Sequence, residues 1–160
     1  DNVAARAYYQ SYIEKAGDTG SHAEAAQAAI TRLDRPSSGP GEAASAQQFL
    51  KEGDRLFGEK KYAEAYAQYR KAAMAAPGLK EAHYRTGLAS FYTADYARVQ
   101  QHCRRALSID PSYADARYLI AYSYLQQKNW TDAEREAREL ARVDEARGQE
   151  MLKHIANARN

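Results

Sequence analysis

The sequence has little of what marks many functional classes. Its 160 residues include one cysteine, four prolines and one tryptophan, and a single cysteine excludes an internal disulfide. No apolar run approaches the roughly 18 residues that a membrane span needs. A formal net charge of +2, with Lys and Arg interleaved with Asp and Glu, is too small to indicate nucleic-acid binding. We therefore expect neither a membrane span nor a nucleic-acid partner.

Catalytic signatures are missing as well. The chain has no Gly-rich phosphate loop, no HExxH, no GxSxG and no cysteine pair. His102 and Cys103 are adjacent, so on a helix their side chains point about 100° apart and make a poor metal pair. Cys103 occupies a packing position and is predicted to be a buried thiol. We expect no enzyme activity, no metal and no cofactor.

What the chain does contain is typical of closely packed helices. Apolar residues make up 44% and charged residues 28%, which favours a folded protein over a disordered tail. Alanine is over-used and arginine outnumbers lysine. This composition suits helices that approach one another closely, and it indicates a GC-rich bacterial source, with the cytoplasm and the periplasm both open.

A spacing of 34 residues organises most of the sequence. Gly53 recurs as Gly87 and Pro77 as Pro111. Two longer series follow the same step: Tyr62, Tyr96 and Trp130, then Ala72, Ala106 and Leu140. A period of this length corresponds to two helices and their turns, and it predicts a stacked array.

The array divides into three units, 46–79, 80–113 and 114–145. The first helix of each unit is predicted over 46–58, 80–92 and 114–126, and the second over 62–75, 96–109 and 130–143. Because the turns between them are short, each pair is expected to be antiparallel. Thr131 and Glu134 have the spacing of a capping box for the last second helix.

The two ends of the chain lie outside the three units. Residues 1–34 are out of phase and predict a helical hairpin, which either closes an upstream array or caps the downstream one. Residues 35–45, with two prolines and two glycines, predict a linker. Residues 146–160 predict a capping helix whose apolar side would cover the end of the array. Its apolar residues are Met151, Leu152, Ile155 and Ala158.

These residues resemble the tetratricopeptide repeat family. The family's pattern is a small residue in the first helix, an aromatic residue opening the second, an alanine three positions later and a terminal proline. The matching positions are Gly53, Tyr62, Ala65, Ala72 and Pro77 in the first unit, Gly87, Tyr96, Ala106 and Pro111 in the second, and Ala121, Trp130 and Ala133 in the third. The resemblance implies an all-α fold, a right-handed superhelix of antiparallel helix pairs (an α-α solenoid), and a protein-interaction scaffold.

The resemblance also implies a partner-binding groove lined by the first helices. Carried onto this chain, its residues are Leu50, Asp54 and Phe57, then Tyr84, Leu88, Phe91 and Tyr92, then Tyr118, Tyr122 and Gln126, with Arg85 and Arg117 nearby. Exposed aromatic side chains of this kind are typical of binding surfaces. The alternatives are that the N-terminal hairpin fills the groove, or that these rings only pack against the second helices.

The sequence therefore predicts a scaffold that binds a peptide or helix of a partner protein, within a bacterial multiprotein assembly. Repeat domains that grip the acidic C-termini of heat-shock chaperones carry Lys and Asn where this chain has Leu50 and Asp54, so we do not expect that ligand. The ligand is expected to have apolar anchors and one or two acids that Arg85 and Arg117 would pair with. Two alternatives remain open: a structural, self-associating segment of a larger repeat protein, and a chaperone of the type III secretion kind.

Overall fold

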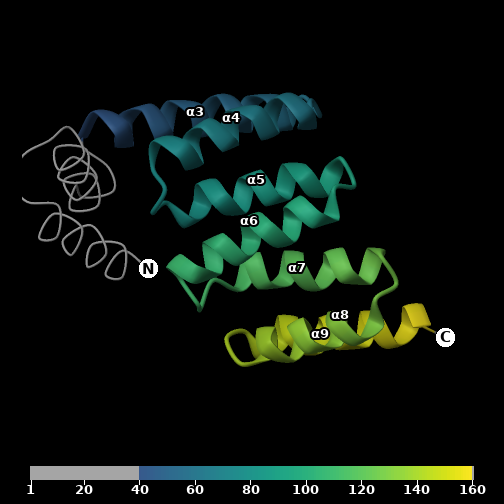
Figure 1. Cartoon of the computed structure of the whole chain (residues 1–160). Coiled ribbons are helices and arrows are strands. Elements are labelled where there is room, and N and C mark those ends of the chain that lie inside the picture. The colour runs from purple at the N-terminus through teal and green to yellow at the C-terminus, as the bar shows by residue number, and fades with distance from the viewer. Residues whose placement is uncertain (1–39, 160) are drawn as a thin grey trace, which may run out of the picture. The chain divides into compact units, whose positions relative to one another are not determined.

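The structure, a computed structural model, describes residues 40–159. The described residues form seven helices and no strand, which confirms the all-α fold (Figure 1). The helices are α3 (Pro40–Gly58), α4 (Tyr62–Ala75), α5 (Lys80–Tyr92), α6 (Tyr96–Ile109), α7 (Ala114–Gln126), α8 (Trp130–Ala141) and α9 (Glu145–Arg159). The predicted hairpin 1–34 and the first part of the predicted linker lie outside the described residues.

Four helices have the bounds that the 34-residue spacing predicts, and α8 ends two residues earlier than expected. The predicted linker 35–45 is wrong in its second half, because α3 already begins at Pro40. Proline is tolerated in the first turn of a helix, where its missing N–H has no partner to lose. The segment after it is rich in alanine and glutamine, which favour helix.

Each pair of helices is joined by the same turn. Lys60, Ala94 and Lys128 have positive φ angles of 61°, 57° and 56°, and they are 34 residues apart. In the middle turn, Ala94 N donates to Phe91 O at 2.9 Å and Asp95 N donates to Ser90 O at 3.0 Å. This is the Schellman pattern of hydrogen bonds, which satisfies the last carbonyl groups of a helix. The repeat in the sequence is thus also a repeat in the backbone.

Two of the three helices after these turns, α6 and α8, are each capped by one side chain. Asp95 accepts a hydrogen bond from Arg98 N, and Asn129 accepts one from Asp132 N. The capping box predicted from Thr131 and Glu134 is wrong, because α8 begins at Trp130 and Asn129 caps it. Lys61, which precedes α4, has the same kind of backbone geometry but no side-chain cap.

The core is a column of small and large side chains that face one another between paired helices. A Cβ atom added to Gly53 would lie 2.5 Å from the ring of Tyr69, and one added to Gly87 would lie 2.8 Å from Cys103 Sγ. In the third unit Ala121 and Ala137 are both fully buried at the corresponding positions. Because the core is close-packed, the missing side chain on one helix leaves room for the ring or thiol on the other. Cys103 is buried, as predicted, and burial raises the pKa of its thiol to about 12.

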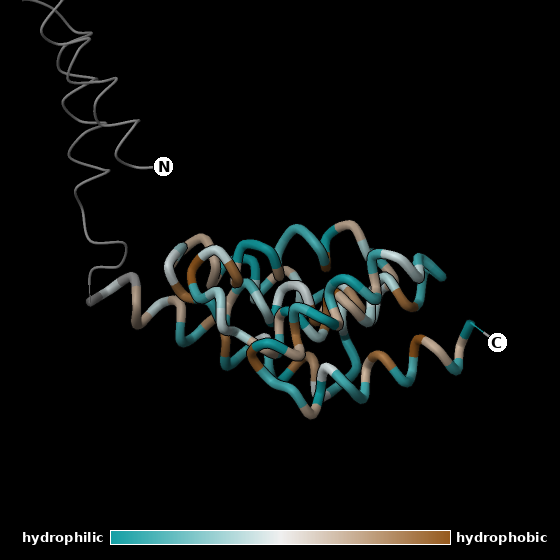
Figure 2. The backbone as a smooth tube through the Cα atoms, turned by 90° about the horizontal axis from the view of Figure 1, so that it is seen from below, coloured by the Kyte–Doolittle hydropathy of each residue, from teal (hydrophilic) through white to brown (hydrophobic). Residues whose placement is uncertain are grey.

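Helix α9 lies against α8 at one end of the array (Figure 1). Gly148, Met151 and Ile155 are buried there, whereas Leu152 is half-buried and Ala158 is exposed. Figure 2 shows hydrophobic and hydrophilic positions alternating along the helices, as expected where one side of each helix packs inward. None of the helices in residues 40–159 has the length and apolar character to span a membrane.

Candidate partner-binding surface

Six aromatic side chains form a continuous row across the three helix pairs. We call this set the aromatic row: Tyr62, Phe57, Tyr92, Phe91, Tyr122 and Tyr118. It begins where α3 turns into α4, crosses to the end of α5 and continues on α7. Each ring lies within 6.1 Å, centroid to centroid, of at least one other member.

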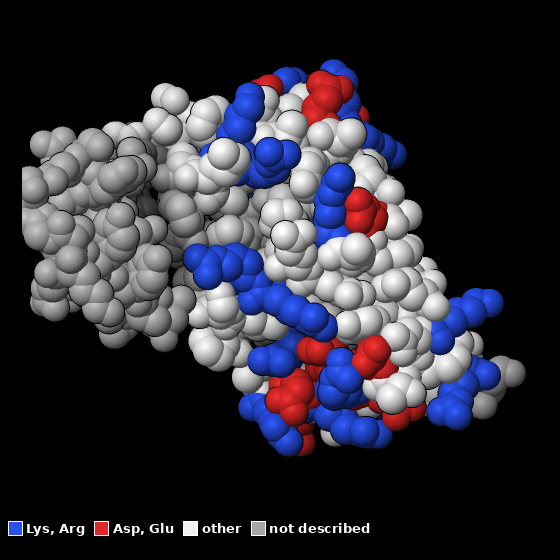
Figure 3. Space-filling model, viewed as in Figure 1, with Lys and Arg blue, Asp and Glu red and all other residues white. Residues whose placement is uncertain are grey.

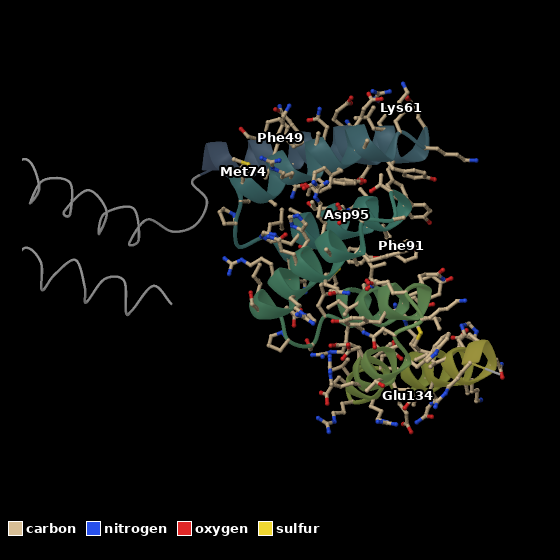
Figure 4. All side chains as sticks on the ribbon, turned by 45° about the vertical axis from the view of Figure 1, so that its right-hand side comes forward. Phe49, Lys61, Met74, Phe91, Asp95 and Glu134 are labelled. Carbon is tan, nitrogen blue, oxygen red and sulfur yellow. The ribbon has the colours of Figure 1, made fainter. Side chains whose placement is uncertain are left out.

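The contacts in the row are close and of several kinds. The rings of Tyr62 and Tyr92 are stacked with centroids 4.5 Å apart, and Phe57 meets both edge-on at 5.1 Å. Phe91 joins α5 to α7 through Tyr122, at 5.3 Å. Figure 4 shows Phe91 at the end of α5 next to α7. Offset and edge-on contacts are the arrangements that the ring quadrupole favours, so the row is a preorganised surface.

The row is partly open to solvent. Tyr92 is 52% exposed, one of three large hydrophobic side chains with such exposure in the described part. Phe57, Phe91, Tyr118 and Tyr122 are half-buried. The row ends at Arg147 of α9, whose guanidinium lies 5.0 Å from the centroid of the Tyr118 ring. Such a contact is favourable because the face of the ring is negative.

Other residues predicted for the groove are placed apart from the row. Leu50 is 7% exposed and belongs to the core between α3 and α4. Tyr84 packs edge-on against Tyr113 at 5.5 Å, and burial raises the pKa of its hydroxyl. Leu88 is half-buried against the core, and Gln126 is exposed at the end of α7.

The charged residues predicted to meet a partner are bound within the chain. Asp54 accepts a hydrogen bond from the hydroxyl of Tyr69 at 2.8 Å and forms an ion pair with Arg85. Arg117 lies between α7 and α8, where it donates to Pro111 O and sits 3.8 Å from Glu136. Its side chain is 17% exposed. Both Arg85 and Arg117 already have partners within the chain, so neither is available to bind a carboxylate of a ligand.

Two features of this surface escaped the reading of the sequence. Arg147 of α9 forms an ion pair with Asp115 of α7 at 2.8 Å, and Arg85 of α5 forms one with Asp54 of α3. Each pair joins a helix to the second helix after it in the chain. The separations of 147 − 115 = 32 and 85 − 54 = 31 residues come close to the repeat length, which was the available signal. Within residues 40–159 no group of three or more His, Cys, Asp or Glu side chains is placed to hold a metal ion.

Comparisons with known proteins agree with the geometry. Residues 91–155 match the family model described as tetratricopeptide repeat. A comparison with curated proteins found no match.

Solved structures share the fold at low sequence identity. The first tetratricopeptide domain of Spaghetti (RPAP3), bound to the HSP90 peptide SRMEEVD, is 19% identical with a TM-score of 0.68, covering 72% of this chain and 94% of that one. The Arabidopsis OM64 domain is 13% identical with a TM-score of 0.69, covering 72% and 98%. The second domain of human RPAP3, in complex with the HSP70 peptide SGPTIEEVD, is 19% identical with a TM-score of 0.65, covering 74% and 98%.

Proposed function

We propose that this chain belongs to the tetratricopeptide repeat family, whose model matches residues 91–155, and that it is a protein-interaction scaffold that binds a segment of a partner protein along the aromatic row. The structural neighbours that support this proposal include two domains solved with a bound peptide. The fold presents the first helices of three units side by side, so one extended or helical segment can touch all three.

The observation that carries the proposal is the continuity of the row across α3, α5 and α7. Tyrosine offers a large contact area and loses little conformational entropy on binding, because it has only two side-chain torsions. The rings already contact one another, so their order is established before the partner arrives. Such preorganisation reduces the entropic cost of association.

The charges near the row favour a ligand without an acidic C-terminus. The peptides named for the two neighbours end in Glu-Glu-Val-Asp. Here Leu50 is buried, Asp54 adds a negative charge, and Arg85 is occupied by Asp54. A ligand carboxylate would have to displace an existing ion pair, so we propose apolar and aromatic anchors as the recognised groups.

The proposal includes a place in a multiprotein assembly of a bacterium, and the Ala- and Arg-rich composition supports the bacterial source. Self-association through the same row is the rival reading. If the chain self-associates, its molar mass in light scattering rises with protein concentration. If the row binds a different protein, the molar mass of the chain alone stays constant.

The test compares two exposed positions. A partner captured with the wild-type chain is titrated against Tyr92→Ala and, as control, Met74→Ala, whose side chain is 68% exposed on α4 outside the row. Tyr92→Ala is expected to lower the affinity by about tenfold or more, the size of a binding hot spot. Met74→Ala is expected to bind like the wild type. Equal affinities for all three proteins, with helical content unchanged, would contradict the proposal.

A further inference from the structure

A second cluster of charged and aromatic side chains lies outside the aromatic row, where α4, α5 and α6 meet. We call it the arginine–histidine cluster, and it consists of Arg70, Arg98, Arg105, Tyr66, His83 and His102. Tyr66 and Arg70 come from α4, His83 from α5, and the remaining three from α6. Over α4 and α6, Figure 3 shows more Lys and Arg than Asp and Glu, whereas both signs crowd together over α8 and α9.

The cluster is held together by contacts between helices. The guanidinium of Arg98 lies 5.2 Å from the centroid of the Tyr66 ring, which in turn is 6.1 Å from the ring of His102. The rings of His102 and His83 are stacked at 6.5 Å. One ring therefore follows another from α4 through α6 to α5, and Arg98 packs against the first of them. Arg70 lies near enough for its charge to act on His102, and Arg105 near enough to act on His83.

Positive charge in this cluster is poorly compensated. Burial lowers the pKa of His102, and the charges of His83, Arg98 and Arg70 lower it further. Burial likewise lowers the pKa of His83, against the effect of its hydrogen bond to Pro77 O, and the charge of Arg105 adds to the lowering. Among the described residues, no carboxylate acts on either histidine to raise its pKa.

The arginines differ in their partners. Arg98 is paired with Asp95 at 3.2 Å. Arg70 and Arg105 are exposed and form no ion pair with any side chain that the structure describes. Helix α6 contains no Asp or Glu between Tyr96 and Ile109, whereas each arginine of α8 is paired with a carboxylate. The cluster thus holds two such arginines, Arg70 on α4 and Arg105 on α6.

A buried polar atom marks the same place. His83 is 9% exposed, its Nε2 is 3.0 Å from Pro77 O, and its Nδ1 has no hydrogen-bond partner among the described residues. A buried polar group without a hydrogen-bond partner destabilises the folded protein. If an anion lay beside His83, the protonated ring could donate a hydrogen bond from Nδ1 to the anion and remove this cost.

We propose that the arginine–histidine cluster is a docking site for an acidic segment of a partner protein, whose Asp or Glu carboxylates bind Arg70 and Arg105. A guanidinium binds a carboxylate through two parallel hydrogen bonds, which makes arginine well suited to such contacts. A nucleic acid fits less well, because binding proteins commonly contact about 6–10 phosphates and three arginines supply too few contacts. The site is separate from the aromatic row, where Arg85 and Arg147 are already paired.

The test uses the full chain and a fluorescent peptide of about ten residues that alternates Glu and Ala, at low salt. Arg70→Gln with Arg105→Gln is compared with Arg138→Gln with Arg142→Gln, which removes the same charge from exposed arginines of α8 and its C-terminus. The first pair is expected to weaken peptide binding by about tenfold or more, and the second by less than about twofold. In NMR titrations of the wild type, the peptide is expected to raise the pKa of His102, because carboxylates near the ring favour its charged form.

Two results would overturn the proposal. One is an equal loss of binding in both double variants, which would mean that the peptide responds only to net charge. The other is a single-stranded oligonucleotide of equal charge that binds more tightly than the peptide through Arg70 and Arg105. Both variants change exposed side chains, and unchanged circular dichroism is the check that they fold.

Discussion

The approach of α9 to α8 depends on the absence of a side chain at Gly148. A Cβ atom there would lie 2.4 Å from both the N and the Cα of Ala141, far inside van der Waals contact. Backbone atoms cannot rotate away as the end of a side chain can, so the two helices would have to separate. The reading of the sequence did not single out Gly148, because a glycine in a helix carries no sign of what it packs against.

We predict that Gly148→Ala destabilises the protein by about 1–3 kcal/mol or more, the usual cost of overpacking. Gly41→Ala is the matched control near the start of another helix, since nothing lies within 4 Å of its added Cβ. Alanine favours helix over glycine, so the control is expected to be neutral or stabilising by up to about 1 kcal/mol. Urea denaturation measures both, and equal stability of the two variants would contradict the packing argument.

At the scale of single elements, the three helix pairs use one turn but not one cap. Asp95 and Asn129 cap α6 and α8, and Lys61 stands at the same place before α4. The backbone angles of Lys61, φ −84° and ψ 65°, are close to those of Asn129, −84° and 77°. A short polar side chain at position 61 would therefore reach the first turn of α4.

Lys61→Asn is accordingly predicted to stabilise the protein by about 0.5–1 kcal/mol, because it satisfies an open N–H group. The lost ion pair with Glu59 is exposed and offsets little of this gain. The reverse change, Asp95→Ala, is expected to cost about 1 kcal/mol. Thermal melting of both variants gives the comparison, and a loss of stability on Lys61→Asn would show that the cap is not transferable.

The interface of α4, α5 and α6 is predicted to be sensitive to acid. His83 and His102 have pKa values below their ordinary value of about 6.5, so the folded state binds fewer protons than the unfolded state as the pH falls. Their contribution is fully present above pH 6.5 and is lost progressively below it. Asp110, with a pKa of about 2 in its pair with Lys80, titrates well below this window. The urea midpoint of unfolding should fall between pH 7.5 and pH 5, and it should fall less in His102→Gln. If the midpoint of that variant depends on pH as strongly as that of the wild type, His102 is not the source of the acid sensitivity.

How much the sequence predicts differs between elements for physical reasons. The bounds of α5, α6 and α7 follow from glycine, proline and aromatic residues at fixed spacing, which act locally. The start of α3 was missed because Pro40 and Gly41 were taken as breakers, although proline suits a first turn. The ion pairs of Arg85 with Asp54 and of Arg117 with Glu136 were not predicted, because they join residues that only packing brings together.

At the scale of the whole array, α9 closes a core that would otherwise meet water. Met151 and Ile155 are 0% and 1% exposed and belong to the cluster that reaches from Val99 to Ile155. A repeat array needs such a terminal helix because each unit covers only its neighbour.

Removal of residues 145–160 is predicted to lower the free energy of unfolding by about 3–6 kcal/mol, since two large apolar side chains contribute roughly 1.5–3 kcal/mol each. Guanidinium denaturation of the shortened chain measures the loss. Replacement of the exposed Lys153 and His154 by alanine is the control and should have little effect. A shortened chain as stable as the full one would mean that α9 is not a structural cap.

The central claim is that a partner protein contacts the aromatic row, and site-specific photo-crosslinking tests it most directly. A benzoyl-phenylalanine at position 92 replaces an exposed ring by another ring, and one at position 74 probes α4 at a similarly exposed site outside the row. We expect the partner captured by the wild type to crosslink at position 92 and to crosslink several-fold more weakly at position 74. Strong crosslinking at 74 with none at 92 would contradict the claim.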